Sequence, residues 1–199
     1  MALDWTDTIS TVAAALSAVA AGGAWWAAQR SSSTARMLTA IERDRRHEDL
    51  TPDIRLALTG QFGDRGSITV HLAGPDSLGD LSSVALEIID DDMDHRLLNP
   101  TPSLTQADVD AHVWGPFRFA PGVDGADQLG RRVAPVPLEM GRGRPFAVER
   151  TRPGHWMDGV VAEGWQGRYV GLPIRLRITC RRGDQVWVLA REMDNPPIR

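Results

Sequence analysis

Over residues 53–199, apolar residues recur at every second position in short runs that glycine, proline and other turn residues separate. The clearest runs are residues 54–58, 68–72, 84–88 and 172–181. An alternation with a period of two places the apolar side chains on one face of an extended strand, so the chain can bury that face. An amphipathic helix would instead need apolar residues at intervals of three and four. We therefore predict a mainly β domain over these residues.

Turn residues and weaker strand patterns extend this interpretation to a particular architecture. Gly183 and Asp184 separate the last long run from residues 185–191, where the alternation resumes, and this predicts a hairpin. Further strand patterns occur at residues 113–119, 133–138 and 145–150. Roughly six or seven short strands with turns between them are typical of an antiparallel β-sandwich that is loosely immunoglobulin-like. Thr105 and Asp108 resemble a capping box, which predicts a short helix at that point.

The N-terminal part of the chain differs from the rest in its hydropathy. Residues 8–29 carry no charged side chain, and their length matches the roughly 20 helical residues that cross a hydrocarbon core of about 30 Å. Trp25 and Trp26 lie near the end of this stretch, where indole rings suit the boundary between lipid headgroups and hydrocarbon. We interpret residues 1–30 as an N-terminal transmembrane helix, which makes the chain a single-pass protein of the cell membrane.

Charged residues on the two sides of this stretch predict its orientation. Asp4 and Asp7 precede it, whereas Arg30 and Arg36 follow it. Because positively charged residues stay on the cytoplasmic side, we expect the N-terminus to lie outside and the C-terminal domain to lie in the cytoplasm. The acidic start also argues against a cleaved signal peptide, which begins with basic residues. A second interpretation stays open, in which the Ala-rich helix packs inside a soluble assembly.

Two features of residues 1–52 bear on assembly and on the link to the domain. Small residues recur at every fourth position along one face of the predicted membrane helix, at Ser10, Ala14, Ala18 and Gly22. Such a face lets two helices approach closely, so it is a candidate surface for a homo-oligomer.

Residues 31–52 follow as a predicted helical stalk, because residues 34–50 contain strong helix formers without glycine or proline and Pro52 ends the pattern.

Composition excludes several classes of chemistry. All 22 basic residues are arginine, and the formal net charge is −4. Without lysine the chain cannot form a Schiff base or a P-loop, and it lacks the basic footprint that nucleic-acid binding requires. Cys180 is the sole cysteine, so no intramolecular disulfide can form, and its place in the alternation predicts a buried thiol. The sequence contains no cofactor-binding motif, and we expect no cofactor.

An acidic run directly after the strand at residues 84–88 is the most suggestive pattern for a metal site. Residues 90–95 contain four aspartates and a histidine. Carboxylates and an imidazole can bind a divalent cation, and alternate residues of an extended chain share one side, so Asp90, Asp92 and His95 are the candidate ligands. The spacing matches no calcium loop. A solvated acidic turn is the simpler interpretation of the run.

Tryptophan and arginine residues near residues 150–168 indicate a surface for a protein partner. Trp156 and Trp165 lie in a glycine-rich stretch without a strand pattern, which makes them candidates for an exposed recognition surface. Plain packing inside the domain is the simpler alternative for both. Arg150, Arg152 and Arg168 lie close to them in the sequence. Tryptophan and arginine are enriched at the energetic centres of protein interfaces, so these five residues are the candidate partner-binding site.

Three blocks of the chain resemble a family of actinobacterial proteins: IERDRRHEDLTPDI at residues 41–54, VWGPFRFAPGVDGAD at 113–127 and RPFAVERTRPGHW at 144–156. Members of that family are similar to this chain in layout, with an N-terminal hydrophobic segment, an Arg/Glu-rich helix and a globular remainder. The resemblance implies this architecture and no particular activity. The missing catalytic motifs and the candidate surface predict a membrane-tethered interaction or scaffold module in the cytoplasm, without catalytic activity. A metal-assisted enzyme with a loop-built site in the acidic run is the alternative.

Overall fold

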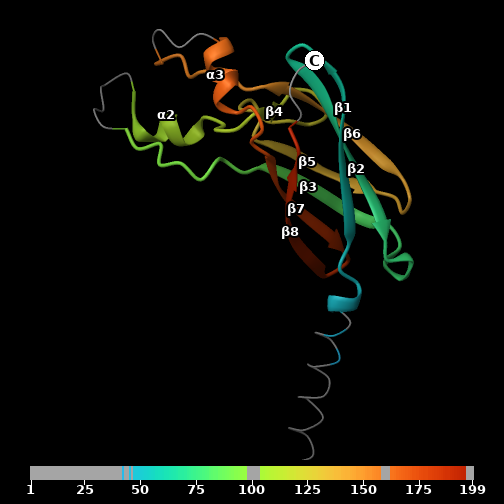
Figure 1. Ribbon diagram of the computed structural model, residues 1–199. Coiled ribbons are helices and arrows are strands. Elements are labelled where there is room, and N and C mark those ends of the chain that lie inside the picture. Colours follow the sequence, from blue (N-terminus) through green and yellow to red (C-terminus); the bar gives the residue numbers. More distant parts are fainter. Residues whose placement is uncertain (1–41, 43–44, 46, 98–103, 158–161, 196–199) are drawn as a thin grey trace, which may run out of the picture. The chain divides into compact units, whose positions relative to one another are not determined.

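The structure is a computed structural model of the chain, and it describes residues 42, 45, 47–97, 104–157 and 162–195 (Figure 1). The chain divides into two compact units, residues 1–49 and residues 50–199. In the first unit, the described residues Glu42, Arg45 and 47–49 are helical. The predicted membrane helix, its small-residue face and most of the predicted stalk lie outside the described residues. Among the residues that are described, no helix is both long enough and apolar enough to cross a membrane.

Within the second unit, the described residues form two four-stranded antiparallel sheets. The first sheet has the order β1-β2-β6-β4, with β1 at Asp53–Phe62, β2 at Arg65–Gly74, β6 at Gly143–Arg150 and β4 at Phe117–Phe119. The second sheet has the order β5-β3-β7-β8, with β5 at Arg132–Leu138, β3 at Leu81–Ile88, β7 at Ile174–Arg182 and β8 at Gln185–Met193. The described helices of this unit are α2 at Gln106–Ala111, α3 at Ala162–Arg168 and the short 3-10 helix η1 at Asp76–Leu78. The predicted mainly β fold with antiparallel sheets is confirmed.

The two sheets pack against each other because their alternating apolar side chains point into a shared core. Ile68, Val70 and Leu72 of β2 are fully buried, as are Leu176 and Ile178 of β7. Each such side chain contributes roughly 1.5–3 kcal/mol when it leaves water. Burial of these alternating apolar side chains therefore supplies most of the free energy that holds the two sheets together.

The predicted capping box opens helix α2, whereas helix α3 differs from the sequence prediction. Thr105 Oγ1 accepts a hydrogen bond from Asp108 N–H, and Asp108 Oδ2 accepts one from Thr105 N–H at 2.7 Å. Helix α3 contains two glycines, which hide its pattern in the sequence. Trp165 lies in this helix and Tyr169 directly follows its last residue, Arg168, and both side chains are buried.

Residues 113–119 also differ from the prediction, since only Phe117–Phe119 form a strand. Trp114 pairs instead with the segment that follows β3. Its N–H donates to Asp90 Oδ1 at 2.9 Å, and its carbonyl accepts a hydrogen bond from Asp91 N–H at 2.8 Å. This pairing carries Trp114 away from the sheet and into the end of the sandwich.

The two ends of the sandwich differ. The chain enters the domain at one end, where Asp53 pairs with Gly74. At the other end Phe117 pairs with Arg150, and helices α2 and α3 lie at this end (Figure 1). We call the structure at this end the cap, and it comprises residues 89–97, 104–116, 151–157 and 162–173.

Candidate binding site in the cap

The cap has its own hydrophobic cluster, built from Val109, Trp114, Trp165 and Tyr169. The ring centroids of Trp114 and Trp165 lie 5.6 Å apart. Both indole N–H groups have acceptors, since Trp165 Nε1 donates to Thr151 Oγ1 and Trp114 Nε1 donates to the Val109 carbonyl, each at 2.9 Å. A buried indole with a satisfied N–H combines a large apolar contact with a fixed orientation. These two tryptophans therefore hold the loops of the cap together.

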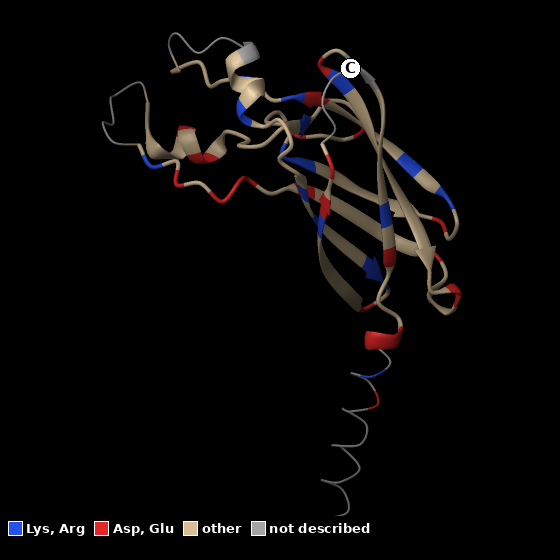
Figure 2. Ribbon diagram, in the orientation of Figure 1, with Lys and Arg blue, Asp and Glu red and all other residues tan. Residues whose placement is uncertain are grey.

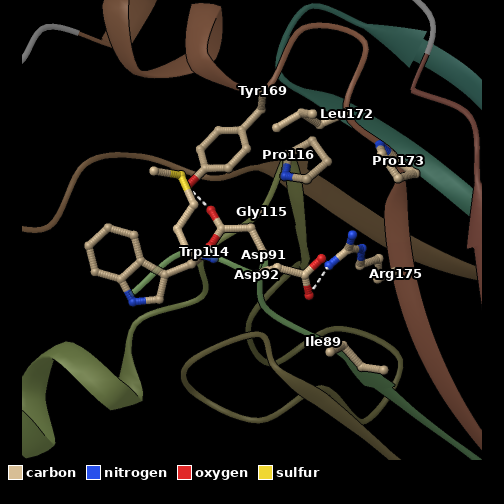
Figure 3. Close-up of a pocket in the computed structure, with 11 residues that line it drawn as sticks. Ile89, Asp91, Asp92, Trp114, Gly115, Pro116, Tyr169, Leu172, Pro173 and Arg175 are labelled. Carbon is tan, nitrogen blue, oxygen red and sulfur yellow. Dashed lines mark hydrogen bonds and ion pairs between the residues drawn. The ribbon is translucent and has the colours of Figure 1, made fainter. Parts of the chain in front are cut away.

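A pocket with a volume of about 260 Å³ opens beside this cluster (Figure 3). Its lining residues come from three segments, within residues 89–93, 114–116 and 169–175. Backbone hydrogen bonds join these segments, since Ile89 N–H donates to the Arg175 carbonyl at 3.0 Å and Asp91 N–H donates to the Trp114 carbonyl at 2.8 Å. The continuation of β3 thus brings the walls of the pocket together.

Two exposed apolar side chains belong to the lining of this pocket. Met93 and Leu172 line it although they are 71% and 43% exposed, and Val170, which is 61% exposed, follows Tyr169 in the chain. The other large apolar side chains that are exposed among the described residues are Val123, Leu129, Val186 and Val188. Exposed apolar groups that gather around a concave site are typical of a binding surface.

Each charged group of the pocket has a partner within the protein (Figure 3). Asp91 Oδ2 accepts a hydrogen bond from the Tyr169 hydroxyl at 3.4 Å, and Asp91 Oδ1 lies 2.5 Å from Nε2 of His95. Asp92 Oδ1 pairs with Arg175 Nη1 at 2.6 Å. Burial, together with the negative charge of Asp91, raises the pKa of Tyr169 above its usual range, so the phenol stays neutral and donates. The pocket therefore presents apolar surface, with its charges already paired.

A second hollow of about 480 Å³ shares Asp91, Met93 and Trp114 with the pocket. Its other lining residues are Asp90, Asp94, His95, Arg96, Gln106 and Asp110. We call it the acidic hollow, because four aspartates line it against one arginine. The three shared residues thus form a wall between two concave sites of different chemistry.

The structure gives each of the three predicted metal ligands a different partner. Asp90 Oδ2 pairs with Arg131 Nη1 at 2.9 Å. Asp92 and His95 have the separate partners described above. Among the residues that the structure describes, no three His, Cys, Asp or Glu side chains are grouped so that they could hold a metal ion. The interpretation as a solvated turn is also incomplete, because these carboxylates fasten the acidic run to other segments of the domain.

Two of the five candidate partner-binding residues are buried, so for Trp165 the alternative of plain packing holds, and neither residue is open to a partner in this structure. Trp165 is 0% exposed and Arg150 is 4% exposed. Trp165 belongs to the cluster of the cap, and Arg150 continues the inward alternation of β6 and lies over an aromatic ring of β4. Arg152 and Arg168 are exposed, and Trp156 is half-buried against the cluster. The role of these three in partner binding stays a prediction.

Sequence reasoning missed the residues that close the pocket from the side of β7. Tyr169 and Leu172 lie between α3 and β7, and Arg175 is the second residue of β7. They lie near Asp91 because β3 and β7 are neighbours in one sheet. The spacing of four between Trp165 and Tyr169 was one signal in the sequence, since it indicates a shared helix face. No local motif marks the other residues.

No protein-family model, curated protein or solved structure matches this chain. At about 260 Å³ the pocket is smaller than the clefts of roughly 300–1,000 Å³ that hold drug-sized ligands. That size suits one apolar side chain of a protein partner. As far as the structure describes it, the lining contains no serine, threonine or cysteine that could act as a nucleophile.

Proposed function

We propose that this chain is a membrane-tethered interaction module without catalytic activity. In this proposal residues 8–29 form the single membrane-spanning helix, residues 31–52 form the stalk, and residues 53–199 form a cytoplasmic domain whose cap holds a partner protein. The observation that carries the proposal is that Met93 and Leu172, two exposed apolar side chains, line the pocket. A partner that covers them would remove apolar surface from water at about 25 cal/mol per Å².

The position of the cap supports this function. The cap lies at the end of the sandwich opposite to Asp53, where the chain enters the domain. A partner can therefore approach the pocket without contact to that entry point. The loosely immunoglobulin-like fold is part of the proposal, since sandwiches of that type carry binding loops at one end.

The pairing of polar groups in the pocket favours binding over catalysis. A general acid or base must reach the proton that it transfers, whereas both oxygens of Asp91 face groups of the protein itself. Arg175 is likewise held by Asp92 and Glu192. Charges that are already paired fix the shape of the walls, and the apolar surface between them supplies the binding free energy.

Fractionation of cells that produce the full-length protein tests the tether. We expect carbonate extraction to leave the protein in the membrane fraction, because a membrane-spanning helix resists extraction. Deletion of residues 1–30 should release the remaining domain. A full-length protein that carbonate extracts completely would contradict the tether.

Site-specific photocrosslinking in the same membranes tests the cap. p-Benzoylphenylalanine is placed at Met93, which is 71% exposed at the pocket, or at Val188, which is 62% exposed on β8 outside the cap. The similar exposure makes Val188 a matched control for non-specific capture. We expect a discrete adduct with another protein at Met93 and none at Val188. Equal adduct patterns at the two positions would show that the cap is not the binding surface.

A further inference from the structure

We infer that the partner segment is a basic peptide, which places a bulky apolar side chain in the pocket of the cap and an arginine or lysine side chain in the acidic hollow. This inference rests on the proposed function and adds the chemistry of the partner to it. The pocket and the hollow share the wall formed by Asp91, Met93 and Trp114. A segment that fills the pocket therefore carries its neighbouring residues to the hollow.

The shared wall also sets the spacing between the two side chains of the peptide. In an extended peptide, residues two positions apart project to the same side, about 6–7 Å from each other. Because the pocket and the hollow share three lining residues, such a spacing lets one peptide place a side chain in each. A simple cation would use only the hollow, and a neutral apolar ligand would use only the pocket. A segment with both groups uses both sites.

The lining of the acidic hollow specifies the charge of the partner. The lining contains four aspartates and one arginine. Asp90 is paired with Arg131 and Asp91 with His95, so the excess of negative charge lies on Asp94 and Asp110. Figure 2 shows this acidity as red ribbon along the segment that follows β3 and on the neighbouring helix α2. The two elements are joined, since Leu97 N–H donates to Gln106 Oε1 at 2.7 Å. The hollow is therefore complementary to a cation.

Two carboxylates of the hollow, Asp94 and Asp110, have no basic partner among the described residues. Asp94 Oδ1 accepts a hydrogen bond from the main-chain N–H of Arg96 at 3.1 Å, and Asp110 Oδ1 accepts one from Gln106 Nε2 at 2.7 Å. Both side chains belong to exposed residues. Each carboxylate keeps an oxygen for a cationic donor of the partner, and charge-assisted hydrogen bonds of this kind are the stronger ones.

Selection from a random dodecapeptide library displayed on phage tests this inference. The bait is the full-length protein in detergent micelles. We expect the enriched peptides to carry a bulky apolar residue two positions from an arginine or lysine, and to have a net positive charge. Enrichment of neutral or acidic peptides, or no enrichment, would overturn the inference.

The double variant Asp94→Asn/Asp110→Asn isolates the charge of the hollow, because asparagine Oδ1 keeps each hydrogen-bond acceptor. We expect the enriched peptides to bind this variant about three- to tenfold more weakly, with a difference that shrinks in high salt. The matched control Asp76→Asn/Asp184→Asn removes two exposed carboxylates outside the cap, and it should bind as the parent protein does. If the two double variants bind the peptides with equal affinity, the inference that the partner is basic is wrong.

The Met93 adduct and the selected peptides together separate failure of the inference from failure of the proposed function, and the variant Leu172→Arg tests whether both depend on the pocket. It places a charge at the mouth of the pocket, so it should abolish both peptide binding and the adduct at Met93. If Met93 forms an adduct but the selected peptides lack basic residues, only the inference fails, and the cap binds a partner of other chemistry. If Met93 forms no adduct and no peptide is selected, the proposed function fails as well.

Discussion

The imidazole ring of His95 lies flat against the indole ring of Trp114, with centroids 3.7 Å apart and an angle of 9° between the planes. The same imidazole reaches the Asp91 carboxylate through Nε2. Trp114 and Asp91 both belong to the wall between the pocket and the acidic hollow. His95 therefore joins the aromatic part of that wall to its acidic part.

Replacement of His95 by alanine should destabilise the domain by about 1–3 kcal/mol, because it removes a stacked ring and a donor to Asp91. Thermal unfolding of the full-length protein in detergent measures this change. His155→Ala is the control, since His155 also contacts a tryptophan, Trp156, but is exposed. If the two variants melt at the same temperature, the stack on Trp114 does not hold the wall.

Trp156 and Trp165 should respond differently to substitution. Trp165 is fully buried and its N–H donates to Thr151, so Trp165→Ala should lower the free energy of unfolding by about 3–5 kcal/mol. Trp156 is half-buried, so Trp156→Ala should cost clearly less. Urea unfolding of the two variants measures the difference. If Trp165→Ala abolishes partner binding, the loss would thus report damage to the cap. Equal destabilisation by Trp165→Ala and Trp156→Ala would contradict this account.

Local periodicity predicts most of the strands, and it also explains the burial of Arg150. Ile68 and Leu72 alternate with polar residues, and the burial of one face follows directly from that pattern. The same alternation runs from Phe146 through Val148 to Arg150, which is buried with them. The sequence prediction named Arg150 because it lies near the tryptophans and because arginine is common at interfaces, and it did not use the position of Arg150 in this alternation. Its position in the alternation predicts the burial of Arg150 correctly.

The pocket could not be predicted, because its residues meet only through the order of the strands. Asp91 follows β3 and Tyr169 precedes β7, and the two strands pair in the second sheet. A local pattern does not determine which strands become neighbours. The acidic run was visible in the sequence, but its partners Arg131 and Arg175 were not, since each comes from a distant segment.

Glu87 on β3 bridges two arginines, which makes its contribution to stability depend on pH. Glu87 Oε1 accepts a hydrogen bond from Arg132 at 2.6 Å, and Oε2 accepts one from Arg177 at 2.9 Å. Burial opposes the charged form, but the hydrogen bonds and charges of the two arginines outweigh it and lower the pKa of Glu87 below 4.5. A lowered pKa stabilises the fold above the unfolded-state pKa, and this contribution is lost as the pH falls through the folded-state pKa.

Glu87→Gln should therefore lower the free energy of unfolding by less than about 1 kcal/mol near neutral pH, and the difference should vanish in strong acid. Urea unfolding at neutral and acid pH measures it. Glu139→Gln is the control, because the side chains of Glu139 and Arg142 are 61% and 76% exposed and their ion pair should contribute less. A Glu87 effect that persists in strong acid would rule out an ionic origin.

Cys180 should be almost unreactive in the folded protein. It is fully buried on β7, as the sequence predicts, and burial raises the pKa of its thiol to about 11. Because the thiolate is the reactive form, Ellman's reagent should modify it only after unfolding. The reaction rates without denaturant and in concentrated guanidinium test this expectation. Equal rates under both conditions would mean that the inner face of β7 is open to solvent.

His112 lies among three tryptophan rings in the cap. Its ring centroid is 4.9 Å from that of Trp114, 5.6 Å from that of Trp156 and 5.5 Å from that of Trp165. Its Nε2 is buried without a hydrogen-bond partner among the described residues. Burial and the positive charge of Arg118 lower the pKa of His112 from 6.5 to about 4. The imidazole is therefore neutral near pH 7.

Protonation of His112 should destabilise the domain as the pH falls. The unfolded chain binds a proton at His112 near pH 6.5 and the folded chain only near pH 4, so stability is full above the first value and decreases between the two. At about pH 5 the expected loss is about 2 kcal/mol relative to about pH 7.5. His112→Phe keeps an aromatic ring among the tryptophans but cannot be protonated, so urea unfolding should show little loss over this range. A loss of the same size in His112→Phe would assign the pH dependence to other groups.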